Sequence, residues 1–411
     1  MKTPTQILSS QVNAGLTSSA GIRKLFEQGI ALKHRYGAEH VYDFSLGNPY
    51  FAPPQFVQHA LQELIANPSD DMHLYMPNAG HLSTRQAVAS HLATRDNLPV
   101  EAKHIVMSIG AAGGLNVALK TIINPDDEVV IIAPYFIEYL NFIKNYQGIA
   151  KISKSNDDFN LNLDALEQAI TPRTKALLLN SPNNPTGAVY DDLTLRKVGE
   201  LLRRKQQEFG TTIFLIADDI YQHIVYDGAI VTPVSKFYDN SLIITSFSKD
   251  LALAGERIGY IYVSPACVDN QRIVEGLVFA TRALGYVNAP SLFQLLIAKV
   301  IGLPIDIKLL ATNRTNLAQI LTQAGVDVRL PHGAFYFFLP VPTNSAVAKN
   351  NDAEFCRFLQ EEFRILAVPG SLFGCSGYFR LSYSVPTAVI SRSEDVWCKA
   401  IQAWHAQGCA T

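Results

Sequence analysis

The chain has 411 residues, of which 48% are hydrophobic and 17% charged, and its 34 Lys and Arg against 36 Asp and Glu give a formal net charge of −2. This composition excludes a disordered chain, and the near-neutral charge argues against nucleic acid or an anionic membrane as the main partner. Residues 1–19 are polar and lack the apolar stretch of a signal peptide, and no apolar run reaches the roughly 18 residues of a membrane span, so we expect a cytoplasmic protein. Five cysteines without CxxC spacing favour reduced thiols over a disulfide framework: Cys267, Cys356, Cys375, Cys398 and Cys409.

The first predicted element is an amphipathic helix over residues 18–36, with Ile22, Leu25, Ile30 and Leu32 as its apolar positions. Between about residues 100 and 265, short apolar runs alternate with helical patterns such as residues 193–209. Four of these runs predict strands of a parallel sheet that is buried on both faces: residues 128–132, 176–179, 213–217 and 242–245. This alternation predicts a doubly wound α/β domain.

After about residue 310 the pattern changes to helices, over residues 312–324 and 353–363, and short strands, over residues 334–339 and 379–383. We therefore expect an α/β protein with two domains. The larger is a three-layer domain with a mainly parallel sheet over residues 48–305, and the smaller is an α+β domain built from residues 1–47 and 306–411.

Polar and aromatic side chains follow the four predicted strands, at the sheet edge where open parallel sheets bind ligands. In chain order they are Phe136, Asn184, Asp218, Tyr221, Ser246, Ser248, Lys249 and Arg257. Each has an ordinary explanation when taken singly: Asp218 as a helix N-cap, the run from Asn184 to Gly187 as a turn, Lys249 as a solvated lysine and Phe136 as core. Their joint occurrence, in this order and at strand ends, favours one functional site.

A glycine-rich segment, residues 108–114, precedes a predicted helix over residues 115–122. Its small residues let backbone amides approach an anion at a helix N-terminus. The segment is neither a Walker loop nor a GxGxxG fingerprint, so it does not support nucleotide binding.

Together these motifs resemble those of the class I and II aminotransferases, which are pyridoxal 5′-phosphate enzymes of fold type I in the aspartate aminotransferase superfamily. The likeness rests on Asn-x-Pro-x-Asn-Pro-Thr-Gly from Asn180, Asp-x-x-Tyr from Asp218, Ser-x-Ser-Lys from Ser246 and a later arginine. It extends over nearly the whole chain, from Leu46 to Ser382. Any single piece is unspecific, whereas the combination is highly specific.

The resemblance implies a role for each of these residues. Lys249 would be the Schiff-base lysine and proton shuttle, and Asp218 would pair with the pyridine nitrogen of pyridoxal 5′-phosphate. Tyr221 and Asn184 would bind the cofactor's phenolic oxygen, and Phe136 would stack on its ring. The phosphate would be held by Gly110, Ala111, Ala112, Ser246, Ser248 and Arg257.

Further implied residues bind the substrate and the partner subunit. Arg380 would clamp the substrate α-carboxylate beside Asn184, and Gly47 resembles the mobile glycine that closes over the substrate. Tyr75 would reach the phosphate of the neighbouring subunit, which implies a homodimer with shared active sites. The resemblance implies no metal.

The implied reaction is transfer of an amino group from an amino acid to a 2-oxo acid by ping-pong chemistry. Aspartate aminotransferases carry a second arginine for the side-chain carboxylate, and Arg282 falls one position away from it. A shifted register would restore that arginine, so dicarboxylate specificity is not implied and no amino donor is named. An aromatic or neutral amino acid is as good a candidate as a dicarboxylic one.

Two other hypotheses remain. A C–S β-lyase or related elimination enzyme of the same fold would share every residue named above. A non-catalytic regulatory module fused to a DNA-binding domain is disfavoured, because the segment before Leu46 is too short for the extra domain.

Overall fold

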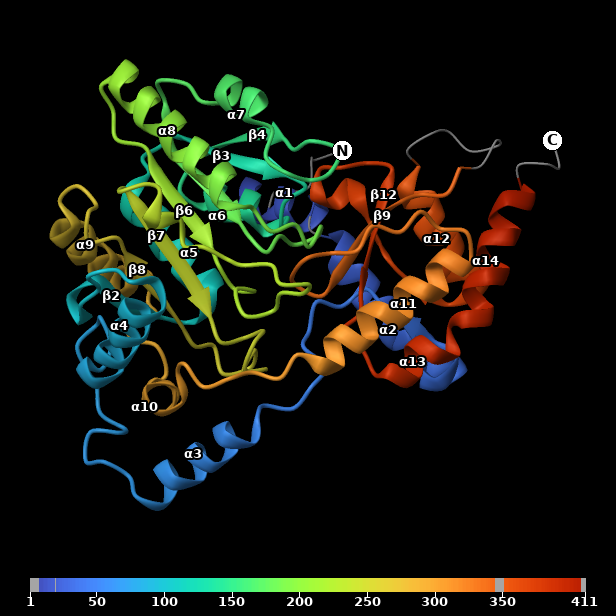
Figure 1. Ribbon diagram of the computed structural model, residues 1–411, viewed down its shortest axis with the longest axis horizontal. Helices are drawn as coiled ribbons and strands as arrows, with labels where there is room; N and C mark the ends of the chain where they lie inside the picture. The colour runs from blue at the N-terminus through green and yellow to red at the C-terminus, as the bar shows by residue number, and fades with distance from the viewer. Residues whose placement is uncertain (1–6, 19, 344–350, 408–411) are drawn as a thin grey trace.

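The computed structural model describes residues 7–18, 20–343 and 351–407, and a seven-stranded sheet forms its larger part (Figure 1). β8 runs antiparallel to both of its neighbours, and the other pairs are parallel, which confirms the expected α/β architecture with a mainly parallel sheet. Across the sheet, the strands are β2 (Ile105–Ser108), β8 (Gly259–Val263), β7 (Ser241–Ser246), β6 (Phe214–Asp218), β5 (Thr174–Asn180), β3 (Glu128–Ala133) and β4 (Ile149–Lys154). The four predicted strands are therefore confirmed as β3, β5, β6 and β7.

Helices cover both faces of this sheet because alternate residues of each strand point to opposite sides. In β3, for example, Val129 and Ile131 belong to one apolar cluster and Val130 and Ile132 to another. The first cluster includes residues of α5 (Gly110–Ile122), α6 (Glu138–Asn145) and α9 (Asn270–Ala283). The second includes residues of α3 (Gln55–Ala66), α4 (Leu82–Asp96), α7 (Leu163–Ala169), α8 (Asp192–Phe209) and α10 (Ser291–Val300).

The remaining elements form a second layered unit with its own core (Figure 1). Its strands are β9 (Tyr336–Pro340), β11 (Val368–Pro369) and β12 (Tyr378–Ser382), which form an antiparallel sheet, and β1 (Tyr42–Asp43), which pairs in parallel with β10 (Ile365–Leu366). Its helices include α11 (Lys308–Gln323), α12 (Asp352–Phe363), α13 (Thr387–Arg392) and α14 (Glu394–Gln407). Because β1 comes from the N-terminal part and β10 from the C-terminal part, this unit supports our proposed division into residues 48–305 and residues 1–47 with 306–411.

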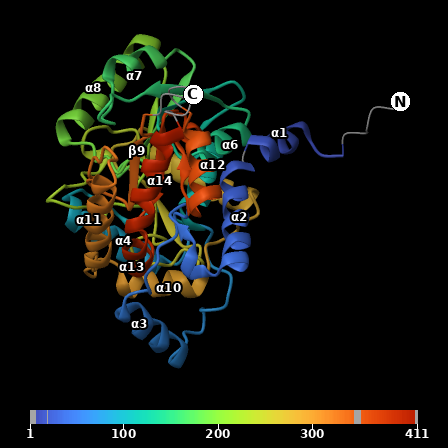
Figure 2. The same cartoon turned by 90° about the vertical axis from the view of Figure 1, so that its right-hand side faces the viewer.

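The N-terminal helix differs from its prediction. Residues on either side of Ser19, which lies outside the described residues, form α1 (Ser10–Ser18) and α2 (Ala20–Tyr36), and α1 projects from the body (Figure 2). The assignment of Ile30 to the apolar face was wrong, because Ile30 is 55% exposed. The inward face instead carries the buried Gly29, and Lys33, whose ammonium lies 2.6 Å from a carboxylate oxygen of Asp43. The side chain of Ile22 lies outside the described part.

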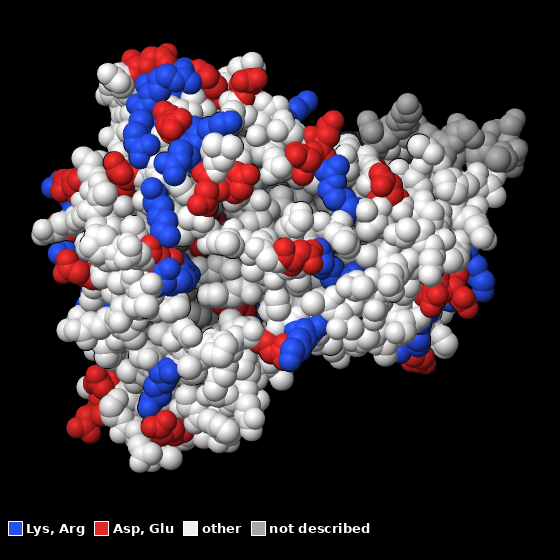
Figure 3. All heavy atoms as spheres, viewed as in Figure 1, with Lys and Arg blue, Asp and Glu red and all other residues white. Residues whose placement is uncertain are grey.

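Within the described residues, four short 3-10 helices complete the secondary structure: η1 (Ala38–His40), η2 (Ala102–His104), η3 (Val234–Lys236) and η4 (Gly370–Phe373). Charged side chains of both signs are interspersed over the face shown in Figure 3, in keeping with the small net charge. None of the described helices is both long enough and apolar enough to cross a bilayer. The four cysteines within the described ranges are free thiols, and Cys409 lies outside them.

Candidate active site

A cavity of about 450 Å³ lies at the carboxyl ends of β5, β6 and β7, where these strands face residues 45–48 and strands β9 and β12. The structure brings most of the sequence-predicted site residues together along its wall. They are Gly47, Ala111, Ala112, Phe136, Asn184, Asp218, Tyr221, Ser246, Ser248, Lys249, Arg257 and Arg380. Gly110 lies immediately behind this wall, and Tyr75 lies outside it.

Asp218 ends β6 as a carboxylate that is almost fully buried, at 4% exposure. Its Oδ2 accepts a hydrogen bond from the Tyr139 hydroxyl, whereas its Oδ1 has no partner among the described residues. Burial raises the pKa of Asp218 to about 7, although the Tyr139 hydrogen bond and the positive charge of Lys249 oppose this rise. A buried carboxylate oxygen without a partner costs free energy, so this atom is placed for a donor that the protein alone does not supply.

Lys249 follows β7 and lies in the same cavity. Its Nζ donates a hydrogen bond of 2.8 Å to the carbonyl oxygen of Gly47 and lies 5.9 Å from the centre of the Phe335 ring. Burial, together with the positive charges of Arg380 and Arg257, lowers the pKa of Lys249 to about 8, against the opposing effect of Asp218. At neutral pH about a tenth of this amine is therefore unprotonated, far more than for an ordinary lysine, and the unprotonated form is the one that a nucleophile or general base requires.

The start of α5 forms the anion-binding end of the cavity. The predicted boundary was wrong, because the helix begins at Gly110 rather than Leu115 and its first turn contains Ala111 and Ala112. The backbone N–H groups of a first helical turn have no partners within the helix, and the helix dipole favours an anion there. The hydroxyls of Ser246 and Ser248 and the guanidinium of Arg257 line the same end.

Gly110 fits this end of the cavity because it has no side chain. Its φ is +71°, a left-handed conformation that favours glycine. A Cβ atom at this position would lie 2.9 Å from Nη2 of Arg257. The glycine thus leaves room for the guanidinium beside the helix start.

Asn184 and Tyr221 project from the loops that follow β5 and β6. The Asn180 side chain fixes this corner, because its Oδ1 accepts the Asn184 backbone N–H at 2.7 Å and its Nδ2 donates to the Asp218 carbonyl at 2.8 Å. The Tyr221 hydroxyl lies 2.9 Å from the hydroxyl of Tyr336. Burial raises the pKa of Tyr221 well above its usual range, so the phenol stays protonated.

Arg380 comes from β12 and is buried at 4% exposure. Its Nη1 donates to Oδ1 of Asn184 at 3.1 Å, and its Nη2 donates to the carbonyl oxygen of Ser45 at 2.7 Å. The guanidinium lies between two aromatic rings, 4.6 Å from the centre of Tyr336 and 4.9 Å from that of Phe373. Its Nε has no partner among the described residues, so a fixed donor remains for an anionic ligand.

Two phenols of this site were missed by the sequence reasoning, Tyr139 on α6 and Tyr336 on β9. Both are buried and would pass for core residues in a sequence. The one available signal is spacing, because Tyr139 lies three positions after Phe136 and therefore on the same side of a helix. The two rings indeed meet edge to face, with centres 5.6 Å apart.

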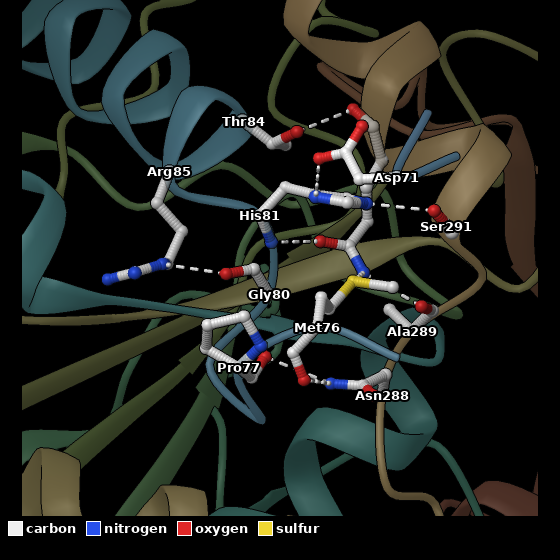
Figure 4. Close-up of polar contacts among 11 residues, drawn as sticks. Asp71, Met76, Pro77, Gly80, His81, Thr84, Arg85, Asn288, Ala289 and Ser291 are labelled. Carbon is white, nitrogen blue, oxygen red and sulfur yellow. Dashed lines mark hydrogen bonds and ion pairs between the residues drawn. The ribbon is translucent and has the colours of Figure 1, made fainter. Parts of the chain in front are cut away.

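Tyr75 is 92% exposed and belongs to the segment between Asp71 and His81. Figure 4 shows polar contacts of that segment. That segment is held to the start of α10 by several hydrogen bonds, although Tyr75 itself is open to solvent. The His81 Nε2 lies 2.8 Å from the Ser291 hydroxyl, and the Asn288 side chain donates to the Pro77 carbonyl at 3.0 Å (Figure 4). The structure therefore does not bring Tyr75 to the cavity of its own chain.

Among the described residues, no group of three or more His, Cys, Asp or Glu side chains is arranged to hold a metal ion. The charged groups that line the cavity are Asp218, Lys249, Arg257 and Arg380. The arrangement offers a nucleophilic amine, a buried carboxylate and two guanidinium groups for anions.

Comparisons with known proteins agree with one another. The family model described as aminotransferase class I and II matches residues 39–393. The chain is 30% identical over 387 residues to the probable aspartate/prephenate aminotransferase of Aquifex aeolicus. The aligned region covers 90% of this chain and 91% of that protein. It is 25% identical to aromatic-amino-acid aminotransferase 2 of Thermococcus litoralis, over 92% and 95% of the two chains. A crystal structure of an aminotransferase from Eubacterium rectale superposes with a TM-score of 0.89 at 38% identity, over 93% of this chain and 95% of that one.

Proposed function

The chain belongs to the class I and II aminotransferase family, and from that premise we propose that it transfers an amino group from an amino acid to a 2-oxo acid by ping-pong chemistry, with Lys249 as Schiff-base lysine and proton shuttle. One observation supports this most strongly: a buried amine with a lowered pKa shares a cavity with a buried carboxylate whose Oδ1 has no partner. The family depends on pyridoxal 5′-phosphate. We propose that this chain binds it too.

The residues around the cavity fit this cofactor. The unpartnered Oδ1 of Asp218 suits a protonated pyridine nitrogen, whose positive charge would keep the carboxylate ionised. The first turn of α5, Ser246, Ser248 and Arg257 would hold the phosphate, Phe136 would contact the ring, and Asn184 with Tyr221 would bind the phenolic oxygen. When bound, pyridoxal 5′-phosphate supplies a carbonyl for amines and a ring that accepts the electron pair left on a substrate's α-carbon.

Lys249 performs the proton transfer in this proposal. Its pKa, lowered to about 8, makes the unprotonated amine accessible near neutral pH, and this form would take a proton from the substrate α-carbon and return it in a later step. Burial also limits competing exchange with water. The Gly47 carbonyl, which accepts from Nζ, orients the amine within the cavity.

Arg380 binds the substrate α-carboxylate in this proposal. Its Nη atoms are oriented by Asn184 and the Ser45 carbonyl, and its Nε remains available. A guanidinium fixed in this way binds a carboxylate at two points and so orients the α-carbon. Gly47 would close over the bound substrate.

For the amino donor, the lining that this chain itself supplies favours an uncharged side chain. Within this chain, the cations that line it are Lys249, Arg257 and Arg380, and each already has a role above. Arg282 is exposed at the end of α9, outside the cavity. A second carboxylate on the substrate would thus need a cation other than the three that this chain places along the cavity wall.

We also propose that the active unit is a cytoplasmic homodimer. The support is Tyr75, whose exposed ring has no role in its own cavity but would be placed to reach the phosphate in a neighbouring subunit.

The test is a half-reaction with the purified holoenzyme and one amino acid at a time, monitored by stopped-flow absorbance. We expect phenylalanine or another donor with an uncharged side chain to convert the cofactor to its aminated form, which absorbs near roughly 330 nm. With a cysteine conjugate, whose β-carbon carries a sulfur leaving group, steady release of the thiol, pyruvate and ammonia without that conversion would instead identify an elimination enzyme.

The matched variants are Lys249→Ala and Lys236→Ala, which remove a buried and an exposed lysine. Lys249→Ala should abolish both turnover and the spectral conversion while circular dichroism stays unchanged, and Lys236→Ala should retain both. Full activity of Lys249→Ala would contradict the proposal.

A further inference from the structure

Tyr336 occupies a position between two residues of the proposed mechanism. It is the first residue of β9 and lines the cavity with 1% exposure. Its hydroxyl lies 2.9 Å from that of Tyr221, and its ring lies under the Arg380 guanidinium at 4.6 Å. One side chain of the smaller unit therefore contacts both the phenol proposed to bind the cofactor and the arginine proposed to bind the substrate.

We propose that Tyr336 is a positioning residue, whose hydroxyl donates to the Tyr221 oxygen and thereby keeps the Tyr221 hydrogen directed toward the cofactor's phenolic oxygen. This inference rests on the proposed function for its account of Tyr221. Two phenols in contact share one hydrogen bond, so one hydroxyl hydrogen is left for another acceptor. If Tyr336 donates, the remaining hydrogen belongs to Tyr221.

The charges around the pair favour this direction. Arg380, on β12, lies directly over the Tyr336 ring, and its positive charge acts on both phenols. The negative charge of Asp218 acts on Tyr221 and not on Tyr336, which makes Tyr221 the weaker donor and the better acceptor of the two. The other groups that face Tyr221 are Asp218 on β6, with Tyr139 of α6 bound to it, and Lys249 after β7. A phenol that accepts a hydrogen bond also becomes a better donor, so Tyr336 strengthens the bond that Tyr221 makes.

The ring of Tyr336 has a separate effect from its hydroxyl. Together with Phe373 it sandwiches the Arg380 guanidinium, and this contact restricts the arginine to the orientation in which Nε stays free. The two effects can be separated by two substitutions, because Tyr336→Phe removes the hydroxyl alone and Tyr336→Leu removes both.

The first measurement is a pH titration of the bound cofactor's absorbance. A hydrogen bond to the phenolic oxygen stabilises its anionic form, so weakening that bond should move the midpoint to higher pH. We expect Tyr336→Phe to raise the midpoint by about one pH unit, in the same direction as Tyr221→Phe and by less. An unchanged midpoint in Tyr336→Phe would overturn the inference.

The second measurement is the affinity for propionate, a carboxylate without an amino group, read from the same absorbance. Tyr336→Phe should bind propionate as the wild type does, whereas Tyr336→Leu should bind it several-fold more weakly. Equal affinity in Tyr336→Leu would refute the role of the ring.

Tyr383→Phe provides the matched control. Tyr383 is another buried tyrosine of the same apolar cluster, but its hydroxyl donates to the Ala334 carbonyl at 3.1 Å and it does not line the cavity. This variant should show the wild-type midpoint, and a shift as large as that of Tyr336→Phe would show a merely structural effect. Failure of the wild type to bind pyridoxal 5′-phosphate would refute the proposed function itself, which distinguishes the two outcomes.

Discussion

At the scale of single residues, the buried carboxylate of Asp218 lowers the stability of the cofactor-free protein, although it is the group proposed to bind the pyridine nitrogen. Its pKa of about 7 in the folded chain stands above the ordinary value of 3.8, and burial is the main cause. Between about pH 4 and pH 7, the folded state therefore keeps a proton on Asp218 that the unfolded chain has already released. Stability falls as the pH rises through this window, because the unfolded state then binds fewer protons than the folded one.

Asp218→Asn should make the cofactor-free protein more stable at pH 8, by up to about 4 kcal/mol, and the gain should shrink toward pH 5. The amide keeps the shape and still accepts a hydrogen bond from Tyr139, but it carries no buried charge. Urea unfolding of wild type and variant at both pH values measures the difference.

Asp126→Asn is the control for this variant, because Asp126 is exposed and its positive φ suits asparagine. It should change stability little and equally at both pH values. A stability difference for Asp218→Asn that is the same at pH 8 and pH 5 would contradict the role given to its buried charge.

Residue by residue, the sequence shows some site groups better than others. Lys249, Asp218 and Asn184 stand out together, because polar side chains that follow several apolar strands in turn predict one shared site, although each alone has an ordinary structural explanation. Tyr139 and Tyr336 do not stand out, because a phenol serves equally well as core, and their roles depend on which hydroxyl each one meets.

At the scale of elements, the predictions succeeded where burial dominates the pattern. Strands β3, β5, β6 and β7 are apolar on both faces, so each leaves a continuous run in the sequence. At the start of α5 the same approach failed. Gly110, Gly113 and Gly114 are poor helix formers by propensity, yet they lie in the first turns of this helix.

A substitution at Gly110, the first residue of α5, tests whether the space beside Arg257 controls anion binding. In Gly110→Ala the new methyl group would lie 2.9 Å from the Arg257 guanidinium and displace it, so we expect weaker binding of pyridoxal 5′-phosphate by about tenfold. The variant should also lose about 1 kcal/mol of stability, because alanine is strained at φ of +71°. Equilibrium titration with the cofactor and thermal unfolding measure the two effects.

Gly210→Ala serves as the control, because Gly210 has a similar φ of +65° and a Cβ there meets no atom within 4 Å. It should show the same loss of stability with unchanged cofactor affinity. If both variants bind the cofactor equally well, steric displacement of Arg257 does not control the phosphate site.

At the scale of the whole molecule, the site is assembled from both units. The sheet supplies Asp218 and Lys249, and the smaller unit supplies Arg380 and Tyr336. Sequence patterns predict that two such units exist, but they do not predict how the units meet, because contacts such as the one between Tyr221 and Tyr336 join residues 115 positions apart.

The proposed homodimer gives a test with hybrid subunits. We expect Tyr75→Ala and Lys249→Ala to be nearly inactive alone and partly active once mixed and refolded together. In the hybrid, one site combines Lys249 of one chain with Tyr75 of the other. Steady-state activity of the mixture measures the recovery, and continued inactivity, with hybrid formation shown by native mass spectrometry, would place Tyr75 outside the neighbouring site.

The Nζ atom of Lys249 has two roles, because it is the proposed reacting group and it also donates a hydrogen bond to the Gly47 carbonyl. The nitrogen that is expected to react also tethers the chain segment that leads from β1 toward α3, and it can do only one of these at a time. Chemistry at Nζ therefore removes this hydrogen bond, while the bond from Arg380 to the Ser45 carbonyl still holds the segment two residues earlier. The freed Gly47 carbonyl would then allow the glycine to close over the substrate, so loading of the site should change the environment of the Gly47 backbone as well as the absorbance of the cofactor.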